Sequence, residues 1–482
     1  MTQELSDRHL QDWNERVSLA EAAVPIIGKL FRDHSVVPTM YGRPLIEKAP
    51  IDILREHRWV RKIEEKELSI RDTFPLLQHL ATMNPRPCRV DLGKLGVNWI
   101  RAGRKPDLAG FLAEQLKELS ALPEKVIDQP QDVVLYGFGR IGRLLARLLI
   151  ERTGSGDGLR LRAIVVRKGS DDDLKKRANL LRRDSVHGRF TGSIVVDEEN
   201  NALIANGRFI KVIYAGAPSE IDYTEHGIDN AIVIDNTGAW RDSKGLGKHL
   251  EAKGVAKVLL TAPGKGEIKN IVFGVNDDQI LPEDKIVSAA SCTTNAITPV
   301  LRAVLDGFGI VGGHVETVHS YTNDQNLIDN YHKKTRRGRA AGLNMVITET
   351  GAAKAVAKAI PELAGKLSGN AIRVPTPNVS MAILNLQLQK PTTAEELNEF
   401  LRKEALFGKM SLQIDFTTST EIASTDLVGS RYAGVVDSAA TIVNGDRVVL
   451  YVWYDNEFGY SMQVVRATQK MAGIQYVTLP RG

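Results

Sequence analysis

A glycine-rich turn between a predicted strand and a predicted helix constrains the fold of this chain more than any other stretch. The apolar run Asp132–Tyr136 predicts a buried strand, and apolar residues recur at helical spacing over Leu144–Glu151. Between them lie Gly137, Gly139 and Gly142, spaced as Gly-x-Gly-x-x-Gly. The first glycine makes a tight turn, the second lets a pyrophosphate approach the backbone, and the third permits close helix–strand packing. A merely flexible turn does not explain the third glycine, so we predict a dinucleotide-binding domain whose helix N-terminus faces the phosphates.

The next predicted strand, Leu161–Val166, ends where such a domain selects its cofactor. An acidic residue at this point accepts hydrogen bonds from the adenosine ribose of NAD. Here the strand is followed by Arg167 and Lys168, a basic pair that favours the ribose phosphate of NADP. A fold-back of Asp171 or Asp172 would restore the preference for NAD. The sequence therefore predicts NAD or NADP as the cofactor and leaves the choice between them open.

Strands and helices alternate up to about residue 290, and polar turns follow two of the strands. Ala231–Asp235 is followed by Thr237 after one residue, and Val255–Leu260 is followed directly by Thr261. Ligands of open α/β sheets bind where the strands end, so we expect both threonines to contact the cofactor. The alternation predicts a doubly wound, Rossmann-type nucleotide domain.

Cys292 is the candidate nucleophile. It lies between a predicted strand that ends near Ala290 and a helical pattern that begins at Ala296, and hydroxyl side chains flank it at Ser291 and Thr293. Unpaired N–H groups and the dipole at a helix N-terminus favour a thiolate. A lone cysteine is more often buried and inert, but the flanking hydroxyls indicate a polar mouth rather than a packed core. The other cysteine, at position 88, is assigned no chemistry.

His319 ends the strand predicted after the helix of Cys292, and we interpret the two residues as a Cys–His pair. The imidazole would stabilise the thiolate and then transfer protons at a substrate oxygen. A buried histidine with satisfied hydrogen bonds is the alternative. Further along the chain, Thr350 and Gly351 open a predicted helix and Arg373 follows, a combination that predicts an anion site.

With these motifs, the stretch from about residue 131 to 475 resembles the phosphorylating glyceraldehyde-3-phosphate dehydrogenase family. The resemblance implies an α+β catalytic domain with an antiparallel sheet, a C-terminal helix that returns to the nucleotide domain, and a homotetramer. It also implies thiolate attack on glyceraldehyde 3-phosphate, hydride transfer to NAD or NADP, and phosphorolysis of the thioester to 1,3-bisphosphoglycerate, or the reverse reaction, as in glycolysis or gluconeogenesis. The motifs that carry the resemblance are Gly137–Arg143, Asp184–Gly188, Ser291–Asn295, His319–Gln325, Thr350–Lys354, Arg373–Ser380 and Trp453–Ser461.

Carried over position by position, the resemblance implies a role for each matching residue. Cys292 would be the nucleophile and His319 its base. Arg140 and Ile141 would lie along the cofactor pyrophosphate, and Asn456 would hold the nicotinamide carboxamide. The substrate's own phosphate would be bound by Thr322 and Arg373, and the attacking inorganic phosphate by Ser291, Thr293, Thr350 and Gly351. No metal site is expected.

Departures from the family pattern bear on the cofactor and on the inorganic phosphate. Glu349 stands beside Thr350 where a hydroxyl is usual, and an inward-pointing carboxylate there would repel a phosphate. Tyr136 replaces a usual Asn. The pair Asn330-Tyr331 replaces a common Leu-Pro, and this second change favours NADP, as does the basic pair Arg167-Lys168. The alternative enzymatic function is a dehydrogenase of erythrose 4-phosphate or a related phospho-aldehyde, with hydrolysis instead of phosphorolysis. A nucleotide-binding regulatory protein on an enzyme scaffold is the alternative from another class.

The composition agrees with a globular protein of several domains. The chain has 482 residues, of which 43% are hydrophobic and 25% charged, with a net charge of +5 and two cysteines. Two cysteines give no disulfide framework and suit a reducing compartment. No apolar run approaches membrane-spanning length, and the N-terminus lacks the apolar core of a signal peptide, so we predict a cytoplasmic protein with no membrane partner. The mild net charge gives no reason to expect nucleic acid as a partner.

The predicted domains are a mostly helical N-terminal extension (residues 1–128), an NAD(P)-binding domain (129–290), a catalytic domain (291–455) and a C-terminal helix (456–482). The family resemblance does not account for the extension. Its helical apolar stripes can be buried on one another, on the catalytic core or on a neighbouring subunit. We expect docking on the catalytic core, because the proline-flanked tether at residues 123–130 is short.

Overall fold

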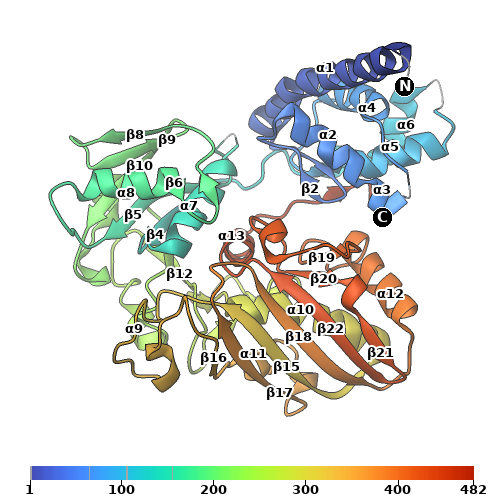
Figure 1. Ribbon diagram of the computed structural model, residues 1–482. Helices are drawn as coiled ribbons and strands as arrows, with labels where there is room; N and C mark the ends of the chain where they lie inside the picture. Colours follow the sequence, from blue (N-terminus) through green and yellow to red (C-terminus); the bar gives the residue numbers. More distant parts are fainter. Residues whose placement is uncertain (1–2, 65, 105–106, 155, 482) are drawn as a thin grey trace. The chain divides into compact units, whose positions relative to one another are not determined.

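The computed structural model describes residues 3–64, 66–104, 107–154 and 156–481 (Figure 1). These residues cluster into two compact units. Unit 1 combines three segments of the chain, residues 1–130, 153–158 and 473–482, and unit 2 comprises residues 131–152 and 159–472. The N-terminal extension thus shares its unit with the C-terminal end of the chain and with a short internal loop.

Unit 1 is a set of helices packed around a small sheet. Its first helix, α1, buries Ala20, Ala23, Ile27 and Leu30, which recur every three or four residues and so line one face. The strand order in the sheet is β2-β1-β3-β23. The helices are α1 (Gln3–His34), α2 (Pro50–Trp59), α3 (Arg61–Glu64), α4 (Ile70–Thr82), α5 (Leu92–Arg101) and α6 (Leu108–Gln115), and the strands are β1 (Val37–Met40), β2 (Arg43–Pro44), β3 (Arg89–Asp91) and β23 (Thr478–Leu479).

The apolar stripes of the N-terminal extension are buried on one another. The cluster of buried apolar side chains in unit 1 draws its members from α1, α2, α4, α5 and α6, from β1 and β3, and from Leu479 in the C-terminal tail. The expectation that these stripes dock on the catalytic core is therefore wrong, because they form a hydrophobic core of their own. The alternative of a small bundle is what the structure shows, completed by a strand that sequence reasoning did not assign to it.

This added strand comes from the end of the chain. β23 pairs in parallel with β3, with Leu479 opposite Val90. The backbone N–H of Arg89 donates to the carbonyl of Val477 at 2.8 Å. The sequence grouped residues 456–482 in one C-terminal segment, whereas residues 473–482 belong to unit 1 in the structure. The domain limits as a whole stay a prediction.

The nucleotide-binding part of unit 2 is a doubly wound α/β sheet, as predicted. The strand order is β13-β14-β12-β11-β4-β5-β10-β9-β8; the pairs from β13 to β10 are parallel, and β9 and β8 are antiparallel. Its central strands are buried along most of their length, as expected where helices cover both faces. The elements are β4 (Gln131–Tyr136), α7 (Arg140–Glu151), β5 (Leu159–Val166), α8 (Asp173–Arg182), β6 (Arg183–Asp184), β7 (Gly188–Arg189), β8 (Ile194–Asp197), β9 (Ala202–Ala205), β10 (Arg208–Tyr214), β11 (Ala231–Asp235), α9 (Ser243–Gly247), β12 (Val255–Leu260), β13 (Lys269–Asn270) and β14 (Ile286–Ser288).

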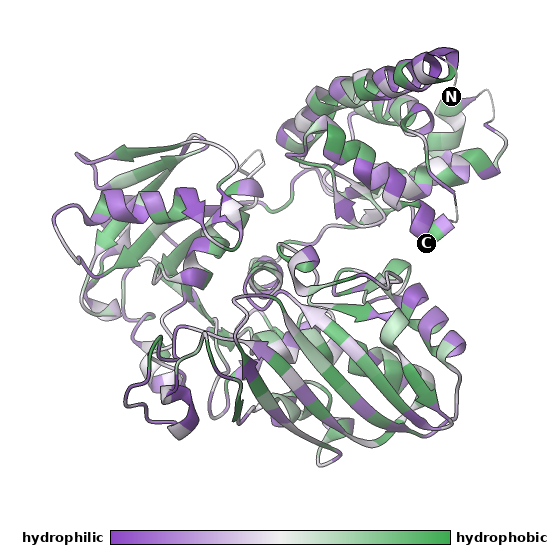
Figure 2. Ribbon diagram, viewed as in Figure 1, coloured by the Kyte–Doolittle hydropathy of each residue, from purple (hydrophilic) through white to green (hydrophobic). Residues whose placement is uncertain are grey.

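The catalytic part of unit 2 is built on a mixed sheet. The strand order is β16-β17-β15-β18-β22-β20-β19, with β21 also paired to β22. Most pairs are antiparallel, as predicted, but β15–β17 and β19–β20 are parallel. Burial alternates along β18, so one face of the sheet meets the helices, and Figure 2 shows the matching alternation of colours on these strands. The elements are α10 (Cys292–Phe308), β15 (Ile310–Ser320), β16 (Val346–Thr348), α11 (Ala352–Ala359), β17 (Leu367–Val374), β18 (Ser380–Leu388), α12 (Ala394–Leu406), β19 (Ile414–Thr417), β20 (Gly434–Asp437), β21 (Ile442–Asn444) and β22 (Arg447–Tyr454).

The last helix, α13 (Phe458–Met471), packs against α7 of the nucleotide-binding part. This contact connects the end of β22 in the catalytic part with the helix that follows the glycine-rich turn. Within the described part of the chain, every helix is too short or too polar to span a bilayer.

Candidate active site

Cys292 is the first residue of α10 and lies shortly after β14. The helix begins here because the hydroxyl of Ser291 accepts the backbone N–H of Thr294 at 3.1 Å, which caps the N-terminus. Apolar residues at helical spacing, Ile297 and Val300 among them, then bury the following turns. Local sequence therefore places the sulfur at a helix N-terminus.

The sulfur of Cys292 lies 3.5 Å from Nε2 of His319, which is 5% exposed near the end of β15. Nη1 of Arg373 lies 2.9 Å from Nδ1 of the same ring and also donates to the carbonyl of Ser320 at 2.9 Å. Nδ1 also lies 2.7 Å from the carbonyl of Ser320, which only accepts hydrogen bonds, so Nδ1 carries the proton and Nε2 faces the sulfur as an acceptor. The structure thus brings the two predicted catalytic residues together and orients the imidazole through the carbonyl of Ser320, which Arg373 also holds.

Burial changes the protonation expected for this pair. The position of Cys292 at a helix N-terminus favours a thiolate, but burial raises the pKa of Cys292, against the lowering effect of Arg373. Burial, followed by the positive charge of Arg373, lowers the pKa of His319 to about 3. Both shifts favour the neutral forms of the pair, a thiol beside an imidazole, because the low dielectric around it opposes the effect of the helix dipole.

Arg373 is also the centre of the predicted site for the substrate phosphate. Its Nη1 lies 3.3 Å from the hydroxyl of Thr322. Its Nε is buried and, among the described residues, has no hydrogen-bond partner. A buried donor without a partner is costly, and a phosphate oxygen would satisfy it. Sequence reasoning missed Arg337, a buried guanidinium that donates to Asp324 and, through Nε, to Thr348 at 3.2 Å.

The residues assigned to inorganic phosphate lie at two helix starts. Ser291 caps α10, while Thr350 and Gly351 precede α11, where the hydroxyl of Thr350 accepts the N–H of Ala352 at 3.2 Å. Thr293 is buried, and its hydroxyl lies 2.9 Å from the hydroxyl of Tyr454. The hydroxyl of Thr293 is thus held by Tyr454, a partner that the sequence did not indicate.

The glycine-rich turn has the geometry that a cofactor pyrophosphate requires. Gly137 has a φ of +95°, which favours glycine. A Cβ on Gly142 would lie 2.4 Å from the carbonyl oxygen of Gly137, so the third glycine permits the close approach of helix to turn. A Cβ on Gly139 would meet nothing within 4 Å, which leaves open space at the start of α7. These three positions fit the roles that the motif assigns to them.

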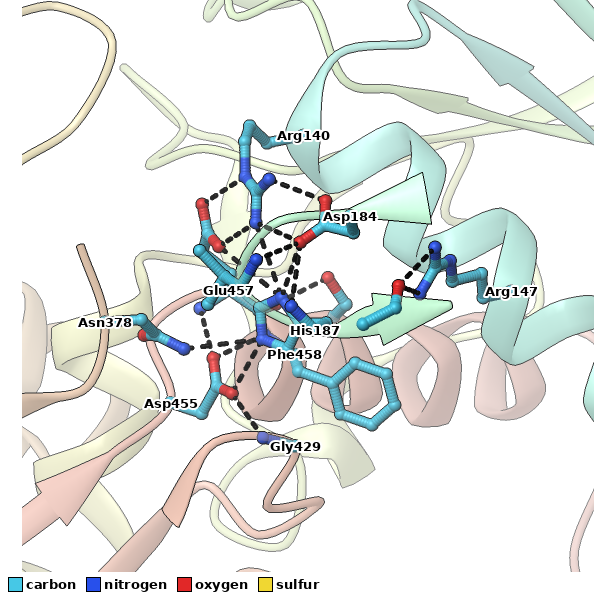
Figure 3. A network of polar contacts seen from close by, with 12 residues as sticks. Arg140, Arg147, Asp184, His187, Asn378, Gly429, Asp455, Glu457 and Phe458 are labelled. Carbon is cyan, nitrogen blue, oxygen red and sulfur yellow. Dashed lines mark hydrogen bonds and ion pairs between the residues drawn. The ribbon is translucent and has the colours of Figure 1, made fainter. Parts of the chain in front are cut away.

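The other predicted cofactor contacts lie at strand ends, on α7 and in the turn between β22 and α13. Thr237 and Thr261 both bind Asp235 at the end of β11: the N–H of Thr237 donates to its carboxylate at 2.7 Å and the hydroxyl of Thr261 to its backbone carbonyl at 3.0 Å. Arg140 begins α7, where it binds Asp184 and Glu457 (Figure 3), and Ile141 follows it. Asn456 lies between β22 and α13, and Arg167 is exposed after β5.

Both parts of unit 2 match families of known proteins. Residues 131–243 match the description "Glyceraldehyde 3-phosphate dehydrogenase, NAD binding domain", and residues 291–456 match "Glyceraldehyde 3-phosphate dehydrogenase, C-terminal domain". A glyceraldehyde-3-phosphate dehydrogenase-like protein of Pseudomonas aeruginosa is 60% identical over 95% of this chain and 100% of its own length. The chain belongs to the glyceraldehyde-3-phosphate dehydrogenase family.

Other relatives match the family core. The chloroplastic glyceraldehyde-3-phosphate dehydrogenase A of Zea mays is 44% identical over 69% of this chain and 80% of its own length. The glyceraldehyde-3-phosphate dehydrogenase of Zymomonas mobilis is 40% identical over 70% of this chain and 98% of its own length. Because the Pseudomonas protein matches 95% of the chain, its similarity extends over most of the N-terminal extension as well.

Family membership makes the protein a dehydrogenase that uses NAD or NADP. The open space at Gly139 and the free Nε of Arg373 agree with this class of enzyme, since the first leaves room for a pyrophosphate and the second for a substrate phosphate. A buried His249–Asp235 pair, with nitrogen and oxygen 3.1 Å apart, also lies at the cofactor edge of the sheet and was missed. Only the position of Asp235 at a strand end could have indicated it.

Proposed function

We propose that the protein oxidises glyceraldehyde 3-phosphate with inorganic phosphate to 1,3-bisphosphoglycerate, or catalyses the reverse reaction. The observation that carries this proposal is the approach of the Cys292 sulfur to Nε2 of His319 at 3.5 Å, beside the guanidinium of Arg373. A nucleophile, a base and an anion binder within one buried site are what a phosphorylated aldehyde requires.

The chain's own residues would act in this order. When the phosphate of the aldehyde binds Arg373, it offsets the positive charge that lowers the pKa of His319, while Nδ1 of His319 keeps donating to the carbonyl of Ser320, 2.7 Å away. The imidazole then accepts the thiol proton, and the Cys292 thiolate attacks the aldehyde carbon. Bound NAD or NADP supplies the acceptor for the hydride. Inorganic phosphate attacks the resulting Cys292 thioester, which releases the acyl phosphate and restores the sulfur.

The inorganic phosphate would be held by Ser291, Thr293, Thr350 and Gly351. Glu349 is exposed after β16, and an exposed carboxylate repels a nearby phosphate less than a buried one. Phosphorolysis is therefore compatible with this departure from the family pattern. A dehydrogenase of erythrose 4-phosphate or a related phospho-aldehyde, with hydrolysis of the thioester, is the alternative within the same site.

The test combines a phosphate titration with a pair of cysteine variants. Turnover of glyceraldehyde 3-phosphate should rise from near zero to saturation with inorganic phosphate, and turnover that is indifferent to phosphate contradicts phosphorolysis. Cys292→Ala should abolish turnover while NAD or NADP still binds. Cys88→Ala removes the other cysteine, which lies in unit 1, and should leave turnover unchanged. Full activity in Cys292→Ala would refute the site.

We propose that the enzyme accepts NADP as a cofactor, alongside NAD in the same site. Arg167 and Lys168 are exposed at the end of β5, where the ribose of the cofactor would lie. The carboxylate of Asp172 is already bound to Ser170 at 2.6 Å and to Lys176 at 2.8 Å, which leaves it little capacity to accept a ribose hydroxyl. One charged contact to a phosphate contributes about 1.5–3 kcal/mol, or roughly tenfold to hundredfold discrimination.

The ratio of kcat/KM for NADP and NAD, in the parent and in Arg167→Asp, tests this preference. The variant should lower the ratio at least tenfold, because it replaces a cation with an anion at the ribose. An unchanged ratio means that Arg167 does not face the cofactor. Arg208→Asp, a charge reversal at a partly exposed arginine on β10, provides a control for the change of net charge.

We further propose a cytoplasmic homotetramer. The loop between β15 and β16 carries strongly exposed apolar side chains, including Leu327 (85%), Tyr331 (87%) and Leu343 (85%). Apolar side chains at this exposure, gathered in one loop, favour burial in an interface. Sedimentation velocity should give a mass four times that of the chain, and Leu327→Asp with Leu343→Asp should lower it; a monomeric parent contradicts the proposal.

A further inference from the structure

The motif Asp184–Gly188 carries part of the family resemblance but has no role in the function above. It forms the hairpin β6–β7, which leaves the sheet of the nucleotide-binding part. Arg147 of α7 (Figure 3) holds the hairpin, since its guanidinium donates to the carbonyl of Gly188 at 3.1 Å. It also donates to the carbonyl of Leu181, near the end of α8, at 2.8 Å. The hairpin is thus fixed on the helix that follows the glycine-rich turn, and it presents His187.

The ring of His187 is almost fully buried and meets residues from both parts of unit 2. Its Nε2 lies 2.9 Å from a carboxylate oxygen of Asp455, and its Nδ1 lies 3.4 Å from Nη2 of Arg140 (Figure 3). Because a carboxylate only accepts, Nε2 carries the proton that is donated to Asp455, and Nδ1 faces Arg140 as an acceptor; Nδ2 of Asn378 lies farther from Nε2, at 3.3 Å. The ring also stacks on Phe458 with centroids 5.6 Å apart.

Asp455 in turn holds the turn that carries Asn456. One carboxylate oxygen accepts the backbone N–H groups of Glu457 at 3.0 Å and Phe458 at 2.8 Å, and so caps α13. The other accepts the proton of His187 and the N–H of Gly429 at 2.8 Å. Burial raises the pKa of Asp455, but the hydrogen bond from His187 is first among the contacts that lower it overall.

The other side of Asn456 is held from the pyrophosphate end of the site. Nε of Arg140 donates to the carboxylate of Glu457 at 2.7 Å, and Nη1 donates to Asp184 at 2.6 Å. The side chain of Asn456 itself accepts the hydroxyl of Ser380 at 2.8 Å. Asn456 therefore lies between two carboxylates, Asp455 and Glu457, that are both bound to the nucleotide-binding part over separations of 268 and 317 residues.

We propose that His187 is a positioning residue for the nicotinamide end of the cofactor, acting through Asp455 on Asn456. The proposal rests on the assignment of Asn456 to the nicotinamide in the function above. Hydride transfer requires the reacting atoms about 3–3.5 Å apart, and a misplacement of about 1 Å can cost a factor of about 100 in rate. An amide on an unsupported turn would not hold the ring to that tolerance, whereas the hydrogen bond from His187 fixes the turn at its first residue.

The test compares how variants of His187 bind the whole dinucleotide and a fragment that lacks the nicotinamide. His187→Phe keeps a ring to stack on Phe458 but removes the proton donor, and His187→Gln keeps an N–H donor. Dissociation constants are measured for whichever of NAD and NADP the parent binds more tightly, and for ADP-ribose or its 2′-phosphate, which lacks nicotinamide. His187→Phe should weaken the dinucleotide about tenfold, the loss of one charge-assisted hydrogen bond, and leave ADP-ribose within twofold. It should also lower kcat while leaving the KM of the aldehyde unchanged, and His187→Gln should restore most of both effects.

Two results overturn the proposal: equal weakening of dinucleotide and ADP-ribose, which indicates general loosening of the site, or no weakening of either. Asn456→Ala tests the assignment of Asn456 to the nicotinamide separately from the positioning role of His187. If Asn456→Ala leaves the ratio of the two dissociation constants unchanged, the role of Asn456 is refuted and the role of His187 with it. If Asn456→Ala changes the ratio and His187→Phe does not, only the positioning role of His187 is refuted.

Discussion

The parallel pairing of β23 with β3 makes the stability of unit 1 depend on a residue at the far end of the chain. Leu479 is 1% exposed and belongs to the hydrophobic core of unit 1, opposite Val90. Leu479→Ala removes its outer methyl groups from this core and leaves the backbone pairing and all chain connections in place. The variant therefore isolates the contribution of one side chain to a core built mainly from the N-terminal extension.

The expected loss follows from the burial of that side chain. Removing three buried carbon groups costs about 0.8 kcal/mol each in transfer free energy, and the cavity that remains adds to this. The sum is about 3 kcal/mol in the free energy of unfolding of unit 1, within the range of about 2–5 kcal/mol for buried Leu→Ala changes. For a unit of this size, 1 kcal/mol shifts Tm by about 3–4 °C, so we expect a decrease of about 10 °C.

Hydrogen exchange, followed by mass spectrometry of peptides, measures this change separately in the two units. Peptides from β1, β3 and α5 should exchange faster in Leu479→Ala, and the enzyme should keep its turnover, since no residue proposed for the active site lies in unit 1. Leu10→Ala is the matched control, because Leu10 belongs to the same unit and is 58% exposed. That change should stay within about 0.5 kcal/mol of the parent. Equal behaviour of the two variants would refute the assignment of the tail to the core of unit 1.

Three further outcomes are expected. Removal of residues 1–130 should leave the tail without its partner strand, so the shortened enzyme should aggregate less when residues 473–482 are removed as well, which light scattering measures. His57 is buried and its pKa is lowered to about 4, chiefly by desolvation. Below about pH 6.5 the unfolded chain therefore binds a proton at His57 that the folded chain does not bind. The free energy of unfolding of unit 1, measured by denaturant titration, should fall by about 2 kcal/mol between pH 7 and pH 5, and His57→Gln should remove this fall. Arg373→Met should raise the KM of glyceraldehyde 3-phosphate at least tenfold and that of unphosphorylated glyceraldehyde less than threefold, by initial rates.

The parts of this structure that local sequence determines could be predicted. The strand, the three glycines and the helix at residues 131–151 lie next to one another in the chain, and each glycine has a local steric reason. The same holds for Cys292, since its position between β14 and α10 follows from an apolar strand and a capping serine. Periodicity also indicated the helices of the extension, because their apolar faces repeat every three or four residues.

Contacts between distant residues could not be predicted in this way. Arg89 and Tyr476 are 387 positions apart, and nothing in either segment indicates that their strands pair. The same is true of His187 and Asp455, whose motifs could be recognised but whose contact depends on the packing of two parts of unit 2. The raised pKa of Cys292 could not be predicted for a related reason: the helix dipole, which favours a thiolate, can be inferred from the sequence, whereas the burial that opposes it depends on the whole fold.

The chain connections of unit 1 explain why a point substitution tests it better than a truncation. The chain passes between the units before β4, after α7, before β5 and after α13. α7 begins with Arg140 and α13 begins directly after Glu457, and these two residues form an ion pair next to Asn456 in the chain. A truncation at residue 130 or 472 therefore also changes a chain end next to β4 or α13, and any loss of activity could arise there. Leu479→Ala leaves these connections intact, so a stable unit 2 with a weakened unit 1 can have only one cause, the lost side chain.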